Sequence, residues 1–251
     1  GMKKVFRENP NATIVSISQN DWYNPCDCPA CTELAEREGS RMAPLLLLVN
    51  RVAEEVEKEY PGKLVDTLAY QWSRRAPKTM RPRSNVVVRL CTIECCFSHS
   101  LGECTSPRNR EFVRDLEEWS KVSDRLWIWN YVTSFSQFFM PFPDIRGRGD
   151  TVLLFTRNNV KGVFQQDIYT TPNGEFNGLS GYLNARLLWD PSADTDAIVH
   201  EFLDGVYGPA AKPIGAYLDM IHAEASPESV HVGVWQGPDA EDGENGHAEQ
   251  G

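Results

Sequence analysis

The sequence predicts an α/β fold in which five or six parallel strands form part of a (β/α)8 barrel, followed by a small helical extension. Three observations predict it. Five short runs are hydrophobic almost throughout, helical patterns lie between most of these runs, and the chain becomes helical beyond the fifth run. Nearly continuous hydrophobicity is typical of strands that are buried on both faces, as in a parallel sheet.

The predicted strands follow one another over the first two-thirds of the chain. They are expected at residues 12–18, 64–70, 86–93, 126–130 and 160–165. A further apolar segment, 151–156, fits either a sixth strand or a short helix.

Two helices are predicted between these strands. Apolar residues recur at three- and four-residue spacing from Leu45 to Val56, and Pro61 and Gly62 end that helix. After the third strand, Ser106 can cap a helix whose first residue is Pro107. The link 71–85 contains two prolines and has no room for an ordinary crossover helix.

Three amphipathic segments predict the helical extension. They cover about 178–189, 194–208 and the stretch around Ile214 and Ile221. We therefore expect a barrel domain at 1–177, a helical extension at 178–225 and an acidic, glycine-rich tail at 226–251, in which 230–235 could form one strand.

The charge distribution argues against two classes of partner. The net charge is −10, and residues 226–251 contain six acids and neither Lys nor Arg, which leaves 29 acids against 25 bases in the first 225 residues. Nucleic acids and anionic membranes are held by clustered Lys and Arg, so neither is an expected partner. The longest aliphatic run, 45–49, is far shorter than the roughly 18 residues of a membrane helix.

Carboxylates, amides and aromatic residues follow the predicted strands. Loops at the carboxyl ends of parallel strands converge on one rim, where functional residues gather. A glycosidase needs one carboxyl group as an acid and a second as a base or nucleophile, and Asp21, Glu94 and Asp167 are the candidates. Each of them could instead cap a helix. The residues expected to bind the sugar are Asn20, Trp22, Tyr70, Trp72, Arg74, Asn130, Tyr131 and Gln166. Among these, the guanidinium of Arg74 could pair with a uronate carboxylate.

Seven cysteines provide a second set of candidates. Cys26, Cys28 and Cys31 form a C-x-C-x2-C cluster, while Cys95, Cys96, His99 and Cys104 should lie on a neighbouring loop. Thiolates and a histidine at short spacing can close a structural zinc site, for which the expected ligands are Cys26, Cys28, Cys31 and Cys95. A disulfide that ties the loops, or free buried thiols, are equally open alternatives, although an odd number excludes complete internal pairing. The phosphate-loop, dinucleotide-binding and serine-hydrolase motifs are absent.

Several segments together resemble one bacterial family of unknown function, numbered 4838. They are SISQNDWYNPCDCPAC (16–31), VAEEVEKEYPGK (52–63), TLAYQW (67–72), NVVVRLCTIECC (85–96), LWIWNYVTSF (126–135), NNVKGVFQQD (158–167) and LLWDPSAD (187–194). The family is similar to the barrels of α-glucuronidases and related glycoside hydrolases. The resemblance implies a secreted or periplasmic protein of polysaccharide degradation, although residues 1–10 carry no apolar signal core.

The resemblance also implies roles for particular residues. The five strands would correspond to the later part of a barrel, with the acid catalyst in the loop that holds Asp21 and a further carboxylate at Glu94. The cysteines that follow Asp21 would be structural. In the family pattern the position of Gln165 often carries an acid, so one charge is missing here.

These observations lead to three competing hypotheses. The first is a glycoside-hydrolase-like domain in which Glu94 and Asp21 act as the acid/base pair and Asp167 supports them. The second is a non-catalytic carbohydrate-binding or scaffold fragment of a larger glycosidase-like protein, and the third is a metal-dependent enzyme that uses the cysteine loops. Because an incomplete barrel exposes sheet edges, we also expect self-association or an added covering element.

Overall fold

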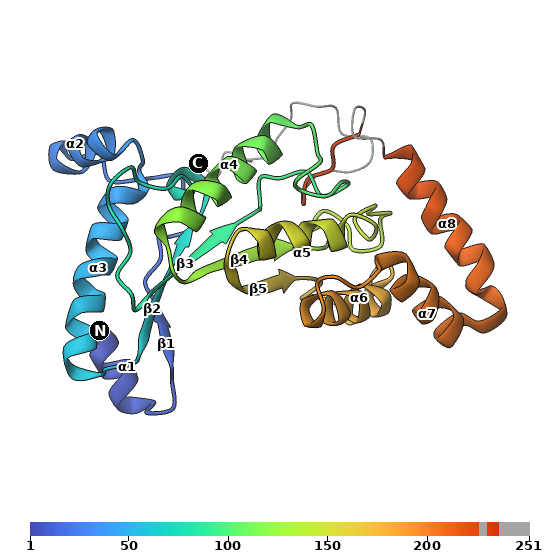
Figure 1. Cartoon of the computed structure of the whole chain (residues 1–251), viewed down its shortest axis with the longest axis horizontal. Helices are drawn as coiled ribbons and strands as arrows, with labels where there is room; N and C mark the ends of the chain where they lie inside the picture. The colour runs from blue at the N-terminus through green and yellow to red at the C-terminus, as the bar shows by residue number, and fades with distance from the viewer. Residues whose placement is uncertain (226–229, 236–251) are drawn as a thin grey trace. The chain divides into compact units, whose positions relative to one another are not determined.

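A computed structural model describes residues 1–225 and 230–235 of the chain. It contains one five-stranded sheet with the sequential order β1-β2-β3-β4-β5 (Figure 1). The strands are β1 (Ile14–Ser16), β2 (Leu64–Ala69), β3 (Val86–Cys91), β4 (Leu126–Tyr131) and β5 (Val160–Gln166). The sheet is parallel, with Val65 opposite Val86 and Val88 opposite Leu126. The predicted α/β fold with five parallel strands is confirmed, and its order is that of successive strands in a (β/α)8 barrel.

Helices connect the strands and continue beyond the last one. They are α1 (Met2–Glu8), α2 (Pro29–Glu38), α3 (Met42–Glu59), α4 (Pro107–Val122), α5 (Arg148–Arg157), α6 (Asn177–Trp189), α7 (Thr195–Tyr207) and α8 (Ala211–Glu224), with the short 3-10 helices η1 (Gln71–Ser73) and η2 (Gly208–Ala210). The Ser106 hydroxyl accepts a hydrogen bond from the Asn109 backbone N–H at 3.2 Å, which confirms the predicted cap of α4.

The ambiguous segment 151–156 lies inside α5 and is therefore not a sixth strand. Val152 and Phe155 are buried at three-residue spacing, and the Thr156 hydroxyl donates to the Val152 carbonyl four residues earlier. Both features belong to a helix, since a strand would bury alternate residues. The link 71–85 contains only η1, as its prolines predict.

The chain groups into two compact units. The first comprises residues 1–92, 114–129 and 158–164, and the second comprises 93–113, 130–157 and everything from Gln165 onward. The division at 177 and 225 that the sequence suggests stays a prediction. Most of the acidic tail lies outside the described residues.

Strand residues and two tryptophans form an ion-pair site in the first unit. The carboxylate of Asp66, buried within β2, pairs with Arg89 of β3 at 2.6 Å. The Arg89 guanidinium lies 5.8 Å from the Trp127 ring centroid and 5.7 Å from that of Trp129. Gly162 of β5 completes the packing, because a Cβ there would lie 3.0 Å from the Trp127 indole. Asp66 therefore has a structural partner inside the sheet.

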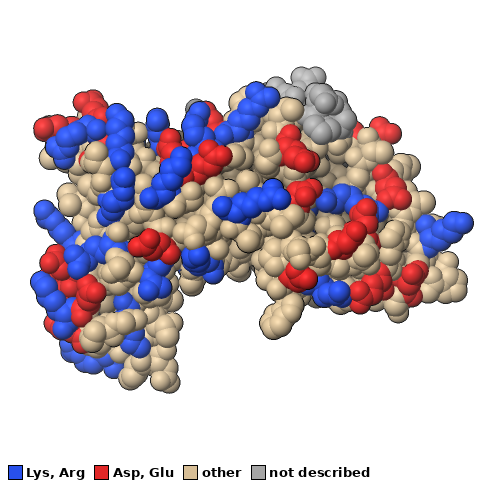
Figure 2. All heavy atoms as spheres, in the orientation of Figure 1, with Lys and Arg blue, Asp and Glu red and all other residues tan. Residues whose placement is uncertain are grey.

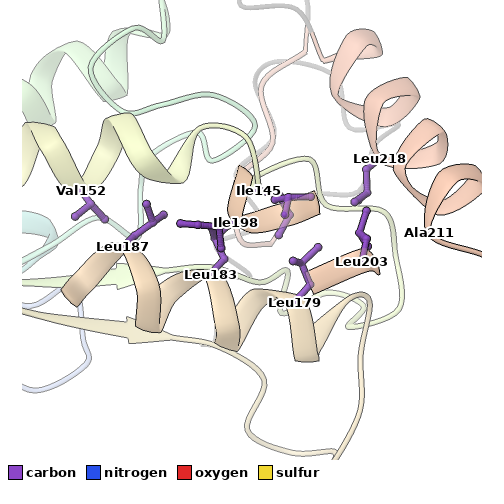
Figure 3. Close-up of a cluster of buried hydrophobic side chains, with 10 residues drawn as sticks. Ile145, Val152, Leu179, Leu183, Leu187, Ile198, Leu203, Ala211 and Leu218 are labelled. Atoms are coloured by element: carbon purple, nitrogen blue, oxygen red, sulfur yellow. The ribbon is translucent and has the colours of Figure 1, made fainter. Parts of the chain in front are cut away.

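A hydrophobic cluster joins α5, α6, α7 and α8 in the second unit (Figure 3). Leu179, Leu183 and Leu187 of α6 are spaced four residues apart and point to one face, toward Ile198 and Leu203 of α7. This spacing is what the amphipathic pattern predicts, and it packs the three C-terminal helices into one core with α5.

The segment 230–235 forms no strand, and residues 234–235 lie in a turn. Val232 accepts a hydrogen bond from the Phe97 backbone N–H at 2.8 Å, and Val234 accepts one from Phe135 at 2.7 Å. Both valine side chains are buried. The alternation of valines in the sequence therefore matches the buried side chains. The two backbone hydrogen bonds go to two different loops, so the segment does not pair with a strand.

Charged side chains of both signs are interspersed on the face of the molecule drawn in Figure 2. Several form exposed ion pairs, among them Arg83 with Glu57 at 2.8 Å and Arg186 with Glu201 at 2.9 Å. Exposed pairs of this kind contribute little stability individually. No helix within 1–225 has both the length and the apolar character needed to span a membrane.

We expect His222 of α8 to make stability depend on pH. Its Nε2 accepts a hydrogen bond from the Arg146 backbone N–H at 3.3 Å, and its Nδ1 lies 2.7 Å from the Leu218 carbonyl, an arrangement that needs a neutral ring. Burial lowers the pKa of His222, and the charges of Arg146 and Arg148 lower it further, against the opposing effect of Asp219.

Because the unfolded chain then binds the proton more readily, stability is complete above about pH 6.5 and falls as the pH drops below it. Urea unfolding at a series of pH values should show this fall in the wild type. The fall should be smaller in His222→Gln, whose amide oxygen can still accept from Arg146. Identical pH profiles for the two proteins would contradict the assignment.

Candidate functional site

The loops after β1 and β2 bring four predicted site residues together in the first unit. The Tyr70 hydroxyl donates to Asp21 Oδ1 at 3.0 Å, and the Trp72 indole donates to the Trp22 carbonyl at 3.1 Å. Asp21, Trp22 and the adjacent Asn20 are exposed. These residues form a polar and aromatic surface. The hydrogen bonds that connect them lie at positions exposed to solvent.

Arg74 lies in a different environment from its predicted neighbours. Its side chain is buried, and its Nε donates to Asp115 Oδ2 at 2.7 Å. Burial raises the pKa of Asp115, and the Arg74 guanidinium opposes that rise. The Arg74 carbonyl also accepts a hydrogen bond from the Trp119 indole at 2.7 Å. Arg74 thus joins η1 to α4 in the core of its unit, and we leave it out of the proposed sugar site.

The predicted residues at the ends of β4 and β5 belong to the second unit. Asn130 and Tyr131 are buried, and the Asn130 amide donates to Gln165 Oε1 at 2.8 Å. The Gln166 carbonyl accepts a hydrogen bond from the Val132 backbone N–H at 3.0 Å. Since β4 extends to Tyr131, the first two side chains lie within the sheet rather than beyond it. Glu94 is half-buried in the loop after β3.

Asp167 is held rigidly just beyond β5. Its Oδ1 accepts a hydrogen bond from the Ile168 backbone N–H at 2.8 Å, and its Oδ2 accepts one from the Ser180 hydroxyl at 2.5 Å. Arg148 Nη1 donates to the same Ser180 hydroxyl at 2.8 Å. Asp167 is therefore connected to a buried polar network.

That network lines a small cavity with three acids. Asp144 is bound by Arg148 through both carboxylate oxygens, at 2.9 and 2.7 Å. The cavity has a volume of about 20 Å³, and Asp144, Arg148, Asp167 and Glu175 are among its lining residues. This volume accommodates about one water molecule, not a sugar ring.

Two of these acids were not predicted from the sequence. Burial raises the pKa of Asp144 to about 7, although Arg148 opposes the rise. Burial also raises the pKa of Glu175, against hydrogen bonds from the Phe142 backbone N–H and the Tyr217 hydroxyl. Both acids lie within long loops rather than at strand ends, so the strand-end rule does not select them.

Four aromatic side chains cluster beside this cavity. Phe135 contacts Tyr169 and Trp235, with ring centroids 5.8 and 5.0 Å apart, and Phe138 contacts Tyr169 at 6.1 Å. Phe138 also lines the cavity that holds Asp167. The Tyr169 side chain is 67% exposed and that of Trp235 is 52% exposed. We call Phe135, Phe138, Tyr169 and Trp235 the aromatic surface.

The first cysteine cluster forms at the start of α2. The Sγ atoms of Cys26, Cys28 and Cys31 all lie within 4.8 Å of one another. Hydrogen bonds from the Cys31 backbone and thiol lower the pKa of Cys28, and the same thiol pair raises the pKa of Cys31 to about 11. The predicted fourth ligand, Cys95, is buried in the other unit and stays a prediction; among the described residues it belongs to neither cysteine cluster.

The second cluster combines two cysteines with two histidines. The ligand atoms of Cys96, His99, Cys104 and His231 all lie within 4.8 Å of one another, close enough to hold a metal ion. A hydrogen bond from the Cys104 thiol lowers the pKa of Cys96 to about 3, and the same contact raises the pKa of Cys104. All seven cysteines are free, so the disulfide alternative is not realised in the structure.

The model of a domain-of-unknown-function family, DUF4838, matches residues 1–219. The chain belongs to the DUF4838 family. A comparison with curated proteins finds no match. The DUF4838 match includes the first cysteine cluster and three members of the second, but it ends before His231 and Trp235.

The DUF4838 domain thus assembles its candidate residues in separate groups. Asp21 lies with Tyr70 and the tryptophans of the first unit, whereas Glu94 and Asp167 belong to the second. Asp167 is joined by Asp144 and Glu175, not by Glu94, as a lining residue of the small cavity. The pairing of Asp21 with Glu94 stays a prediction.

Proposed function

We propose that this DUF4838 domain binds carbohydrate on the aromatic surface next to Asp167. The observation that carries the proposal is the exposure of Tyr169 and Trp235 beside a cavity lined by carboxylates. Aromatic faces hold sugar rings through their apolar C–H groups, and carboxylates accept hydrogen bonds from sugar hydroxyls.

The charges near this surface favour a neutral sugar over a uronate. Asp167 and Glu175 line the cavity. The guanidinium group that lines it belongs to Arg148 and is already bound by Asp144. A sugar carboxylate would meet like charges without a free cation of the cavity to pair with it. A neutral sugar thus replaces the uronate expected from the sequence, in which Arg74 was the candidate partner.

Hydrolysis is the second candidate function, and one observation favours it. Glu175, whose pKa is raised by burial, and Asp167 line the same cavity. A carboxyl group with a raised pKa and a neighbouring carboxylate are the two groups that a glycosidase requires. The cavity itself is too small for a sugar ring, so a substrate would have to bind at its opening, over Phe138.

Binding can be tested by calorimetry with neutral and uronic-acid-bearing oligosaccharides of equal length. We expect neutral oligosaccharides to bind more tightly, and Tyr169→Ala or Trp235→Ala to weaken binding about fivefold, since one stacking contact contributes about 1 kcal/mol. Trp189→Ala is the matched control, because this indole is 92% exposed on α6 and lies outside the aromatic surface. Equal losses in all three variants, or no binding to any glycan, would reject the proposal.

The same oligosaccharides separate binding from hydrolysis. If the domain is hydrolytic, prolonged incubation should release product, and Glu175→Gln should abolish the release while leaving binding intact. Binding without product in the wild type would reject hydrolysis on these substrates and leave carbohydrate binding as the function.

A further inference from the structure

We propose that Cys96, His99, Cys104 and His231 bind a structural Zn²⁺ ion. Three of these residues lie in the loop between β3 and α4, and the fourth comes from the segment 230–235. Both cysteines are buried and both histidines are half-buried. The proposal is independent of carbohydrate binding and would hold for a domain with any activity.

The distances within the cluster fit a tetrahedral zinc site. Zn–S bonds of about 2.3 Å and Zn–N bonds of about 2.0–2.1 Å place a sulfur and a nitrogen ligand about 3.5–3.6 Å apart. Cys96 Sγ lies 3.5 Å from His99 Nδ1, and Cys104 Sγ lies 3.5 Å from His231 Nδ1. All four ligand atoms are mutually close, so one ion can reach every one of them.

The hydrogen bond of His99 leaves the correct nitrogen for the ion. His99 Nε2 lies 3.1 Å from the Ala225 carbonyl, and a carbonyl can only accept a hydrogen bond. The ring proton therefore belongs on Nε2, and Nδ1 keeps its lone pair on the side of Cys96. Metal-bound histidines ordinarily donate their second ring N–H to a carbonyl or carboxylate in this way.

The loop that supplies three ligands is fixed by its own contacts. The Asn109 side chain accepts from the Cys96 backbone N–H at 2.7 Å and donates to the Cys96 carbonyl at 3.0 Å. Gly147 packs against the next part of the loop, where a Cβ would lie 2.6 Å from the Ser100 nitrogen. The ligands are thus held in place before the ion binds, which favours tight binding.

The ligand set indicates a structural rather than a catalytic ion. Two thiolates and two imidazoles complete four-coordinate zinc, and no position remains for water or substrate. The ion would join the β3–α4 loop to the segment 230–235, which already bonds to Phe97 through Val232. Its role is to fasten this late segment to the second unit.

Metal analysis of the purified full chain tests the proposal. The background variant Cys26→Ser removes a ligand of the first cluster, and in it we expect one equivalent of zinc per chain. His231→Ala and Cys104→Ser should each lose that equivalent. Cys95→Ala is the matched control, because it removes the adjacent buried thiol, which belongs to neither cluster, and should keep the zinc.

Cobalt substitution gives a second readout, with all four proposed ligands in place. In the Cys26→Ser background, Co²⁺ should produce the visible absorption of tetrahedral cobalt together with thiolate-to-metal charge transfer, and added Zn²⁺ should remove both. His231→Cys should retain one equivalent of metal with a stronger charge-transfer band. If the metal-free protein takes up neither ion, the proposal is overturned, and the cluster holds only two S–H···N hydrogen bonds. A zinc content that His231→Ala leaves unchanged would also overturn it.

Discussion

Substitution of Arg148 by Met is expected to lower the free energy of unfolding by about 3–5 kcal/mol. Arg148 is buried, and its guanidinium donates to Asp144, Ser180, Asn184 and the Val132 carbonyl. Met fills a similar volume but leaves the Asp144 carboxylate buried without a countercharge, and it leaves several acceptors without a donor. Urea unfolding near neutral pH measures the loss.

The double variant Arg148→Met with Asp144→Leu separates the two causes. Removing both charges should recover much of the lost stability, because a buried ion pair replaced by apolar residues is often close to neutral. In the single variant the loss should be smaller below about pH 7 than above it, because burial raises the pKa of Asp144 to about 7 and the protonated group needs no countercharge. A loss below about 1 kcal/mol in the single variant would show that water reaches the remaining carboxylate.

Trp119→Ala is expected to destabilise the first unit by about 3–5 kcal/mol. Trp119 of α4 is 0% exposed, and its indole donates to the Arg74 carbonyl at 2.7 Å. The substitution leaves a cavity and removes the donor of a buried carbonyl. Trp119→Phe is the control, because it retains most of the apolar volume and loses only the hydrogen bond, so its cost should be about 1–3 kcal/mol. Equal losses of stability in both variants would contradict the separation of the cavity effect from the hydrogen-bond effect.

The strands could be predicted from the sequence because each is apolar almost throughout, and the three inner strands pair on both sides. All five predicted strands end within two residues of their observed positions, although β1, which pairs only with β2, is limited to Ile14–Ser16. Helix α2 was not predicted, since only Leu34 and Ala35 among its apolar residues are buried and the remainder of its pattern is polar.

The candidate site was harder to predict, for reasons of distance along the chain. His231 lies 127 residues after its neighbour Cys104, so no local spacing reveals it. Cys95 and Cys96 are adjacent and chemically identical, and only the fold determines that Cys96 joins the cluster. Tyr131 was predicted to lie beyond the strand that ends at Asn130, but β4 continues through Tyr131 and both side chains are buried.

The segment 230–235 has a practical consequence for defining the domain. The family match stops at residue 219, inside α8, yet the segment that follows supplies two buried valines, Trp235 of the aromatic surface and His231 of the second cysteine cluster. A protein trimmed to the family boundary would expose the apolar contacts of Val232 and Val234 to solvent. The folded module therefore extends at least to Trp235, which lies beyond the last residue that the family model matches.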